Sequence, residues 1–111
     1  MSKITFSQAM QGYLLAIGAR HLSEHTVKDY VNTFHKFTAF LGDDVPIEDI
    51  THKKIEAFFT AQTTVSNKTL LNYHTGLSSL WTWAMREHLV HHHVVRNVTP
   101  PKPEEREIVP F

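Results

Sequence analysis

Apolar residues recur every three or four positions along most of the chain, the spacing that places side chains on one face of an α-helix. Four segments show this pattern, and each follows a Ser or Thr suited to capping a helix N-terminus. We therefore expect helices that begin after Thr5, Ser23, Thr51 and Ser66 and that end near Gly18, Gly42, Gln62 and His88. Their expected inward-facing residues are Phe6, Met10, Tyr13, Leu14 and Ile17; Val27, Tyr30, Val31, Phe34, Phe37 and Leu41; Ile55, Phe58 and Phe59; and Leu70, Tyr73, Leu77, Leu80, Trp81 and Ala84.

The remaining segments add little regular structure. The pattern favours a short fifth helical piece at residues 91–96, and the prolines at positions 100, 101 and 103 break any helix beyond it. No stretch alternates clearly enough between apolar and polar residues to predict a strand. The sequence therefore predicts an all-α domain of four helices and a terminal turn.

The composition fits this prediction and excludes several classes of function. The chain has 111 residues, of which 41% are hydrophobic and 20% are charged, as expected for one globular domain. It contains no Cys, which excludes disulfide bonds, thiolate zinc sites and cysteine nucleophiles. No apolar run approaches the ~20 residues of a membrane-spanning helix, and the N-terminus lacks the apolar region of a signal peptide. We therefore expect a cytoplasmic protein without a membrane partner.

Charge is balanced overall, with 11 Lys and Arg against 11 Asp and Glu, so a surface for nucleic acid would require charges sorted by face. The polar face of the fourth expected helix carries no carboxylate; it consists of Lys68, Asn72, Thr75, Ser79, Thr82 and Arg86. The matching face of the second helix has Asp29 at its margin and consists of His25, Lys28, Asn32 and Lys36. Such faces suit DNA, because cations neutralise phosphates and small polar groups bond phosphate oxygens or base edges. Each face taken alone is, however, more typical of an ordinary solvated helix surface.

A repeated arrangement of residues links these helices to a known family. Ser, then Thr three positions later and Tyr four positions after that, precede apolar residues in segments 23–37 and 66–84. Between them, segment 50–58 has the pattern Ile-Thr-x-x-x-Ile-x-x-Phe. This combination resembles the N-terminal core-binding domain of tyrosine recombinases, the phage-integrase family. The chain departs from the family pattern after Asn97, where Val98 occupies a position at which Pro is common.

The resemblance implies an orthogonal, SAM-like bundle of four to five helices, with residues 1–99 as the core-binding domain and residues 100–111 as a linker towards a catalytic domain absent from this chain. It implies that the domain grips double-stranded DNA while that catalytic domain cuts and rejoins strands. The chain itself is then expected not to be an enzyme and to need no cofactor, and its further partners are its own catalytic domain and neighbouring protomers on DNA. In the family, the second and fourth helices lie against the major groove. This points to His25, Lys28, Asn32, Lys36, Asn67, Lys68, Asn72, Thr75, Ser79 and Arg86 as DNA-binding residues.

Two other interpretations stay open at this point. Zero net charge favours a helical protein–protein interaction module without DNA affinity. If the fourth helix continued, His88 and His92 would lie one turn apart, a spacing at which two imidazoles can ligate zinc or nickel; we expect a polar helix end there and no physiological metal site.

The tyrosines at positions 13, 30 and 73 fall on the apolar faces of their helices, so we expect them to pack in the core rather than to act as nucleophiles.

Overall fold

In the computed structural model, which describes residues 3–100, the regular structure consists of helices. They are α1 (Phe6–Ala19), α2 (Glu24–Leu41), the 3₁₀-helix η1 (Ile47–Asp49), α3 (His52–Ala61), α4 (Asn67–Arg86) and the 3₁₀-helix η2 (Val94–Asn97). The described residues contain no β-strand, only an isolated bridge between Thr5 and Pro46. The all-α prediction is confirmed. None of the helices in this part of the chain is long and apolar enough to span a bilayer.

Each α-helix begins at the N-cap that the sequence predicts. Thr5 forms a complete capping box with Gln8, in which Thr5 Oγ1 accepts from the Gln8 N–H at 3.2 Å and the Thr5 N–H donates to Gln8 Oε1 at 3.0 Å. The side chains of Ser23, Thr51 and Ser66 each accept a hydrogen bond from the backbone N–H three residues later. These bonds satisfy N–H groups that have no partner inside the helix.

A histidine in the left-handed conformation follows the last turn of α1 and of α4. α4 ends at Arg86, two residues before the predicted end, because His88 has a φ of 62° and turns the chain away from the helix. The Leu89 N–H then donates to the Ala84 carbonyl oxygen at 2.8 Å, as in a Schellman motif. His21 terminates α1 in the same conformation, with a φ of 58°. Glycine is the usual signal for this conformation, and neither position has one.

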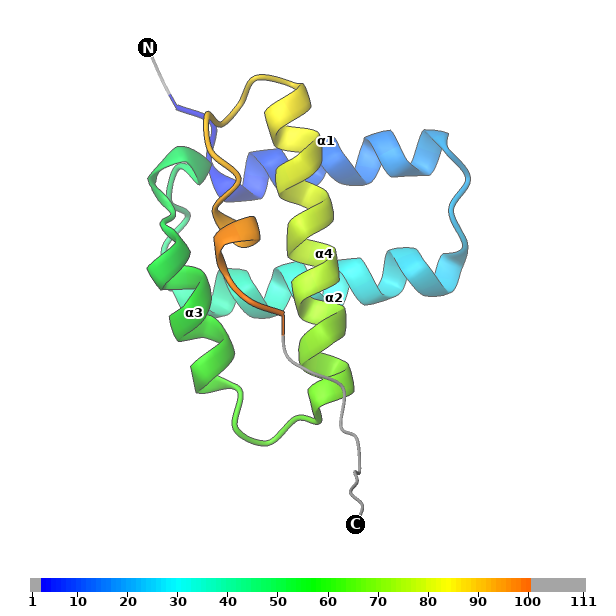
Figure 1. The fold of residues 1–111 in the computed structure, drawn as a ribbon. Coiled ribbons are helices and arrows are strands. Elements are labelled where there is room, and N and C mark those ends of the chain that lie inside the picture. The colour runs from blue at the N-terminus through cyan, green and yellow to red at the C-terminus, as the bar shows by residue number, and fades with distance from the viewer. Residues whose placement is uncertain (1–2, 101–111) are drawn as a thin grey trace.

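α4 crosses both α1 and α2, which run side by side in opposite directions (Figure 1). The segment that contains η2 returns between α3 and α4 and packs against both (Figure 1). This crossed arrangement confirms the predicted orthogonal bundle. The fifth helical piece exists as η2, which is shifted from the predicted range of 91–96 because the ring of His93 caps it: His93 Nδ1 accepts from the Arg96 N–H at 3.1 Å.

An aromatic cluster fills the space between the helices. Phe6, Phe37 and Phe58 come from α1, α2 and α3 and are fully buried. The ring centroids of Phe6 and Phe37, and those of Phe37 and Phe58, are 5.1 Å apart in the edge-to-face arrangement that aromatic rings prefer. Trp81 of α4 lies 5.9 Å from Phe6. The prediction of buried residues was too wide at the margins of the faces, where seven of them are only half-buried: Leu14, Val27, Tyr30, Val31, Leu41, Phe59 and Leu70.

The segment after α4 completes the core, which the periodic pattern did not predict. Val90, Val95 and Val98 are buried, and His93 is only 7% exposed. His74 of α4 donates from Nε2 to the Val98 carbonyl oxygen at 3.0 Å. Two histidines therefore attach this segment to the bundle. The predicted linker at 100–111 lies, apart from its first residue, outside the described residues.

Candidate nucleic-acid interface

α2 and α4 cross closely because Gly76 lies at the point of contact. A β-carbon at residue 76 would lie 3.3 Å from Tyr30 Cδ1 and 3.6 Å from Thr33 Cγ2. Thr33 is itself buried, and its hydroxyl donates to the Asp29 carbonyl oxygen at 2.9 Å. Small groups at the crossing bring the polar faces of the two helices together along one seam.

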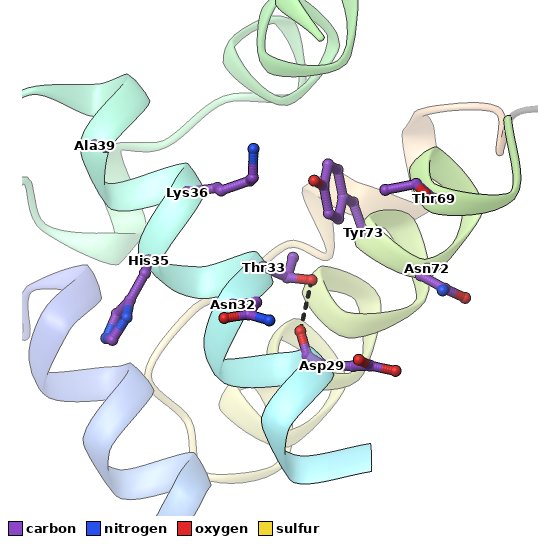
Figure 2. Close-up of a pocket in the computed structure, with 9 residues that line it drawn as sticks. All are labelled: Asp29, Asn32, Thr33, His35, Lys36, Ala39, Thr69, Asn72 and Tyr73. Carbon is purple, nitrogen blue, oxygen red and sulfur yellow. Dashed lines mark hydrogen bonds between the residues drawn. The ribbon is translucent and has the colours of Figure 1, made fainter. Parts of the chain in front are cut away.

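The first hollow on this seam has a volume of about 620 Å³ and lies between α2 and the N-terminal half of α4 (Figure 2). Lys36 extends from α2 toward Tyr73, with Nζ 6.0 Å from the ring centroid, a cation–π contact that holds the ammonium group over the hollow. The amides of Asn32 and Asn72 line it from opposite helices. The lining residues are Asp29, Asn32, Thr33, His35, Lys36, Ala39, Thr69, Asn72 and Tyr73.

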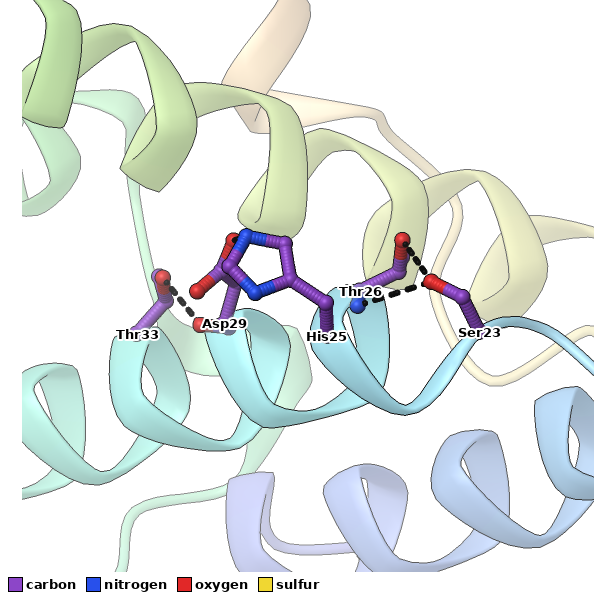
Figure 3. A network of polar contacts seen from close by, with 5 residues as sticks. All are labelled: Ser23, His25, Thr26, Asp29 and Thr33. Atoms are coloured by element: carbon purple, nitrogen blue, oxygen red, sulfur yellow. Dashed lines mark hydrogen bonds and ion pairs between the residues drawn. The ribbon is translucent and has the colours of Figure 1, made fainter.

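A second hollow, of about 180 Å³, adjoins the first and shares Asp29 and Asn72 with it. The Asp29 carboxylate lies 3.4 Å from His25 Nε2, one turn earlier on α2 and beside the Ser23 cap (Figure 3). The predicted marginal carboxylate is thus a negative charge inside the seam, and the imidazole of His25 faces it. The lining residues are Thr26, Asp29, Tyr30, Asn72 and Thr75.

A third hollow, of about 200 Å³, lies beside the C-terminal half of α4 and the end of α1. Thr82 is at its inner edge, since Thr82 Oγ1 lies 3.0 Å from His93 Nε2. Thr82 is therefore half-buried, although the sequence places it on the polar face of α4. The lining residues are Tyr13, Arg20, Ser78, Ser79, Thr82, Trp83 and Arg86.

The structure leaves every predicted DNA-binding residue at least partly accessible, and the three hollows gather some of them. Only Asn67 and Ser79 are half-buried, and the others are exposed. Those that line a hollow are Asn32, Lys36, Asn72, Thr75, Ser79 and Arg86. Those that line none of the three are His25, Lys28, Asn67 and Lys68.

Sequence reasoning missed Tyr13 and Arg20, which reach the third hollow from α1. A helical wheel treats each helix separately, so it contains no signal that the end of α1 lies beside α4. The place of Asp29 had a signal, because residues 25, 29 and 32 follow one another at helical spacing on a single face.

The histidines after α4 do not form the helical pair that was considered for a metal. Because α4 ends at Arg86, His88 and His92 do not share a helix. His91 Nε2 lies 3.3 Å from Glu48 Oε2, and His93 is buried in the core. Between residues 3 and 100, no three His, Cys, Asp or Glu side chains are grouped in a way that could hold a metal ion.

The helix order and the crossed bundle can now be compared with known proteins. The sequence model of the phage integrase N-terminal SAM-like domain matches residues 9–90. The chain belongs to this family. The matched range of this SAM-like domain contains α2, α3 and α4 entirely and most of α1, and therefore all the helices that line the three hollows.

Two solved structures share the fold of this SAM-like domain. One is a crystal structure of a lambda integrase (75–356) dimer bound to a COC′ core site, with a TM-score of 0.78 and 21% identity over 92% of this chain and 37% of that one. The other is the integrase from mycobacterium phage Brujita, with a TM-score of 0.76 and 22% identity over 92% of this chain and 34% of that one. The chain thus spans about a third of the length of either integrase. No curated protein matches it in sequence.

Proposed function

We propose that this SAM-like domain is the DNA-binding, core-binding domain of a tyrosine recombinase. Residues 1–99 would grip the recombination-site duplex, and residues 100–111 would lead to a separate catalytic domain that cuts and rejoins strands. That domain and neighbouring protomers on the DNA would be its protein partners, and the cytoplasm, where such DNA is found, its compartment. The fold match to an integrase whose structure contains its core site supports this proposal.

The observation that carries the proposal is the polar face of α4. The whole helix contains no Asp or Glu, and its exposed face has Lys68 near one end and Arg86 at the other. These residues are 18 positions apart, which corresponds to about 27 Å along the helix axis. The major groove is about 12 Å wide. A helix lying in the groove could therefore place a cation near each phosphate backbone and the smaller side chains near base edges.

The seam with α2 supplies the polar groups that such a helix needs. Asn32 and Asn72 present side-chain amides, which can bond both N6 and N7 of adenine. Lys36 adds a cation held over the same hollow. Four cations, Lys28, Lys36, Lys68 and Arg86, match the modest number of phosphate contacts expected of a domain that shares the duplex with a separate catalytic domain.

The distribution of acidic residues favours DNA over the rival interpretation of a protein–protein interaction module. A run of carboxylates, Asp43, Asp44, Glu48 and Asp49, lies in the connection between α2 and α3 and in η1. These residues line none of the three hollows. These four acidic residues therefore lie away from the α2–α4 seam, where Asp29 is the one carboxylate that lines any of the three hollows, and α4 itself contains none.

The test is a titration of the chain with a short duplex at several salt concentrations. Four to six phosphate contacts predict a slope of log K against log salt near −4 to −5. Lys68→Ala and Arg86→Ala should each weaken binding and reduce the slope by about 1, with unchanged circular dichroism and melting temperature. Lys53→Ala is the matched control, because Lys53 is exposed on α3 and lines none of the three hollows.

If Lys68→Ala and Arg86→Ala bind like Lys53→Ala, the assignment of the α4 face is wrong. If the parent binds no duplex even at low salt, the proposed function is wrong. Self-association or binding to a partner protein, without affinity for DNA, would then favour the interaction module.

A further inference from the structure

The third hollow brings together two arginines from different helices. Arg20 is the C-cap residue of α1, and Arg86 lies in the last turn of α4. Both line the hollow, although 66 positions separate them in the sequence (86 − 20). Both are exposed, and within residues 3–100 neither takes part in an ion pair. Their guanidinium groups are therefore free to bind an anion.

The space between the arginines is lined with hydroxyl groups. Ser79 and Thr82 contribute theirs from α4, and Tyr13 contributes its phenol from α1. His93 Nε2 carries the ring proton, because Nδ1 accepts from the backbone, and this proton is shared by Thr82 Oγ1 at 3.0 Å and the Ser78 carbonyl oxygen at 3.1 Å, so Thr82 cannot donate to the ring. The proton of the Thr82 hydroxyl is then available to a ligand. The phenol of Tyr13 is protonated at neutral pH, because the ordinary pKa of tyrosine is about 10 and burial raises the pKa of Tyr13 further.

The walls of the hollow are held in place by packing. The indole of Trp83 lies against Gly12, where a β-carbon would come within 2.8 Å of Cη2, and its ring centroid lies 5.8 Å from that of Tyr13. The two arginines are positioned by the ends of their helices, which the left-handed residues His21 and His88 fix. The hollow therefore presents its donors without needing a rearrangement of the backbone.

We propose that Arg20 and Arg86 form a clamp for a single phosphodiester of the DNA backbone, with the hydroxyls of the third hollow as additional donors. Planar guanidinium groups bind phosphate oxygens through paired hydrogen bonds. The lining has two cations, four hydroxyl-bearing side chains and no carboxylate, so a phosphate anion is the ligand it suits. The proposal deepens the proposed function, on which it rests, by extending the interface from α2 and α4 to the end of α1.

The first experiment titrates the ¹⁵N-labelled chain with inorganic phosphate, at constant pH and ionic strength, against chloride. The clamp predicts shifts at the side-chain Nε–Hε signals of Arg20 and Arg86 and at the amide of Ser79. In Arg20→Ala, the shift at Arg86 should be lost. Uniform shifts of all arginines, or a shift at Arg86 that survives in Arg20→Ala, would overturn the clamp.

The second experiment measures duplex binding by Arg20→Ala, Arg86→Ala, the double variant and the control Lys53→Ala. Each single arginine variant should weaken binding by about three- to tenfold, the range for the loss of one typical hydrogen bond. Because both arginines hold one phosphate, the double variant should lose less than the product of the two single losses. Arg20→Lys should recover part of the affinity, since it keeps the charge but not the planar fork.

The outcomes separate this clamp from the proposed function. If Lys68→Ala weakens binding while Arg20→Ala behaves like Lys53→Ala, the domain binds DNA and the clamp is wrong. If the losses of Arg20→Ala and Arg86→Ala multiply fully, the two arginines contact different phosphates and the single-phosphate clamp is wrong. If the parent binds no duplex, the proposed function fails, and the phosphate titration alone decides whether the hollow holds this anion.

Discussion

Gly12 of α1 lies against the indole ring of Trp83 of α4, so closely that a β-carbon at residue 12 would be 2.8 Å from Cη2 of the ring. Real β-carbons essentially never come this close to another atom, so a side chain at residue 12 would require the indole of Trp83 to shift. The contact also accounts for Trp83, which the structure leaves half-buried against α1.

Gly12→Ala should therefore destabilise the fold by about 1–3 kcal/mol, the usual range for overpacking at a close contact. Gly18→Ala is the matched control on the same helix, because a β-carbon there would meet nothing within 4 Å. Alanine at that site should stabilise by about 0.5–1 kcal/mol through helix propensity. Denaturant unfolding of both variants measures the difference. A Gly12→Ala variant as stable as Gly18→Ala would show that the indole moves aside freely.

The N-cap of α4 gives a second prediction. Ser66 Oγ accepts from the Thr69 N–H at 3.2 Å, and α4 is the helix that contacts α1, α2 and η2. Ser66→Ala should lower the free energy of unfolding by about 1 kcal/mol, the usual effect of losing a side-chain cap. Thr64→Ala, at an exposed position in the preceding loop, is the control and should be nearly neutral. Equal effects of the two substitutions on thermal unfolding would contradict the capping role.

The buried ring of His93 should make stability depend on pH. Its Nδ1 accepts from the Arg96 N–H at 3.1 Å, so the neutral ring carries its proton on Nε2, which the Ser78 carbonyl oxygen at 3.1 Å and Thr82 Oγ1 at 3.0 Å share. Protonation of Nδ1 would replace the first bond with a clash of two N–H groups. Burial, together with the positive charge of Arg96, holds the pKa of His93 below its ordinary value in the folded state.

Because the folded-state pKa of His93 is lowered, the unfolded chain binds the proton more readily than the folded one. This contribution to stability is therefore complete above about pH 6.5, the ordinary value for histidine, and is lost as the pH falls below it. The loss has a slope of at most about 1.4 kcal/mol per pH unit and stops at the folded-state pKa.

His93→Asn tests this dependence, since the asparagine oxygen can cap η2 in the position of Nδ1 but cannot take up a proton. At pH 7.5 the free energy of unfolding of the variant should be lower than that of the parent, because the substitution removes the hydrogen bond to Ser78. Between pH 7 and pH 5, however, it should change less than that of the parent. Parallel pH profiles for the two proteins would show that His93 does not titrate differently on folding.

The helices and their N-caps could be predicted from the sequence because these features depend on residues close together in the chain. Thr5 and Gln8 form their capping box three positions apart, and the apolar spacing follows from helix geometry alone. The end of α4 could not be predicted, since His88 adopts the left-handed conformation that glycine usually signals. Local pattern therefore determines where helices begin better than where they end.

The candidate interface divides in the same way. The polar face of α4 is a property of one helix, and the sequence shows it. The third hollow depends on how α1 meets α4, so Arg20 has no signal in its own neighbourhood that connects it with Arg86. The burial of His93 likewise depends on a segment that returns against α4 from outside the periodic pattern.

Asp29 is the residue of the seam whose charge opposes DNA, and its removal gives the last prediction. It lines both hollows between α2 and α4, so a phosphate bound there would lie near the carboxylate. At about 7 Å, and with the dielectric constant of water, two unit charges repel by about 0.6 kcal/mol. Asp29→Asn should therefore strengthen duplex binding about threefold at low salt, and the gain should fade as added salt screens the charges.

Asp43→Asn is the matched control for Asp29→Asn, because it changes the net charge equally in the exposed loop after α2. A general effect of net charge would strengthen binding in both variants alike, whereas a phosphate near the seam strengthens it only in Asp29→Asn. Folding stability should change little, since the pair of Asp29 with His25 is largely exposed and such pairs contribute about 0–1 kcal/mol. Equal affinities of the two variants, measured at low salt, would place the DNA away from the α2–α4 seam and contradict the interface proposed for this domain.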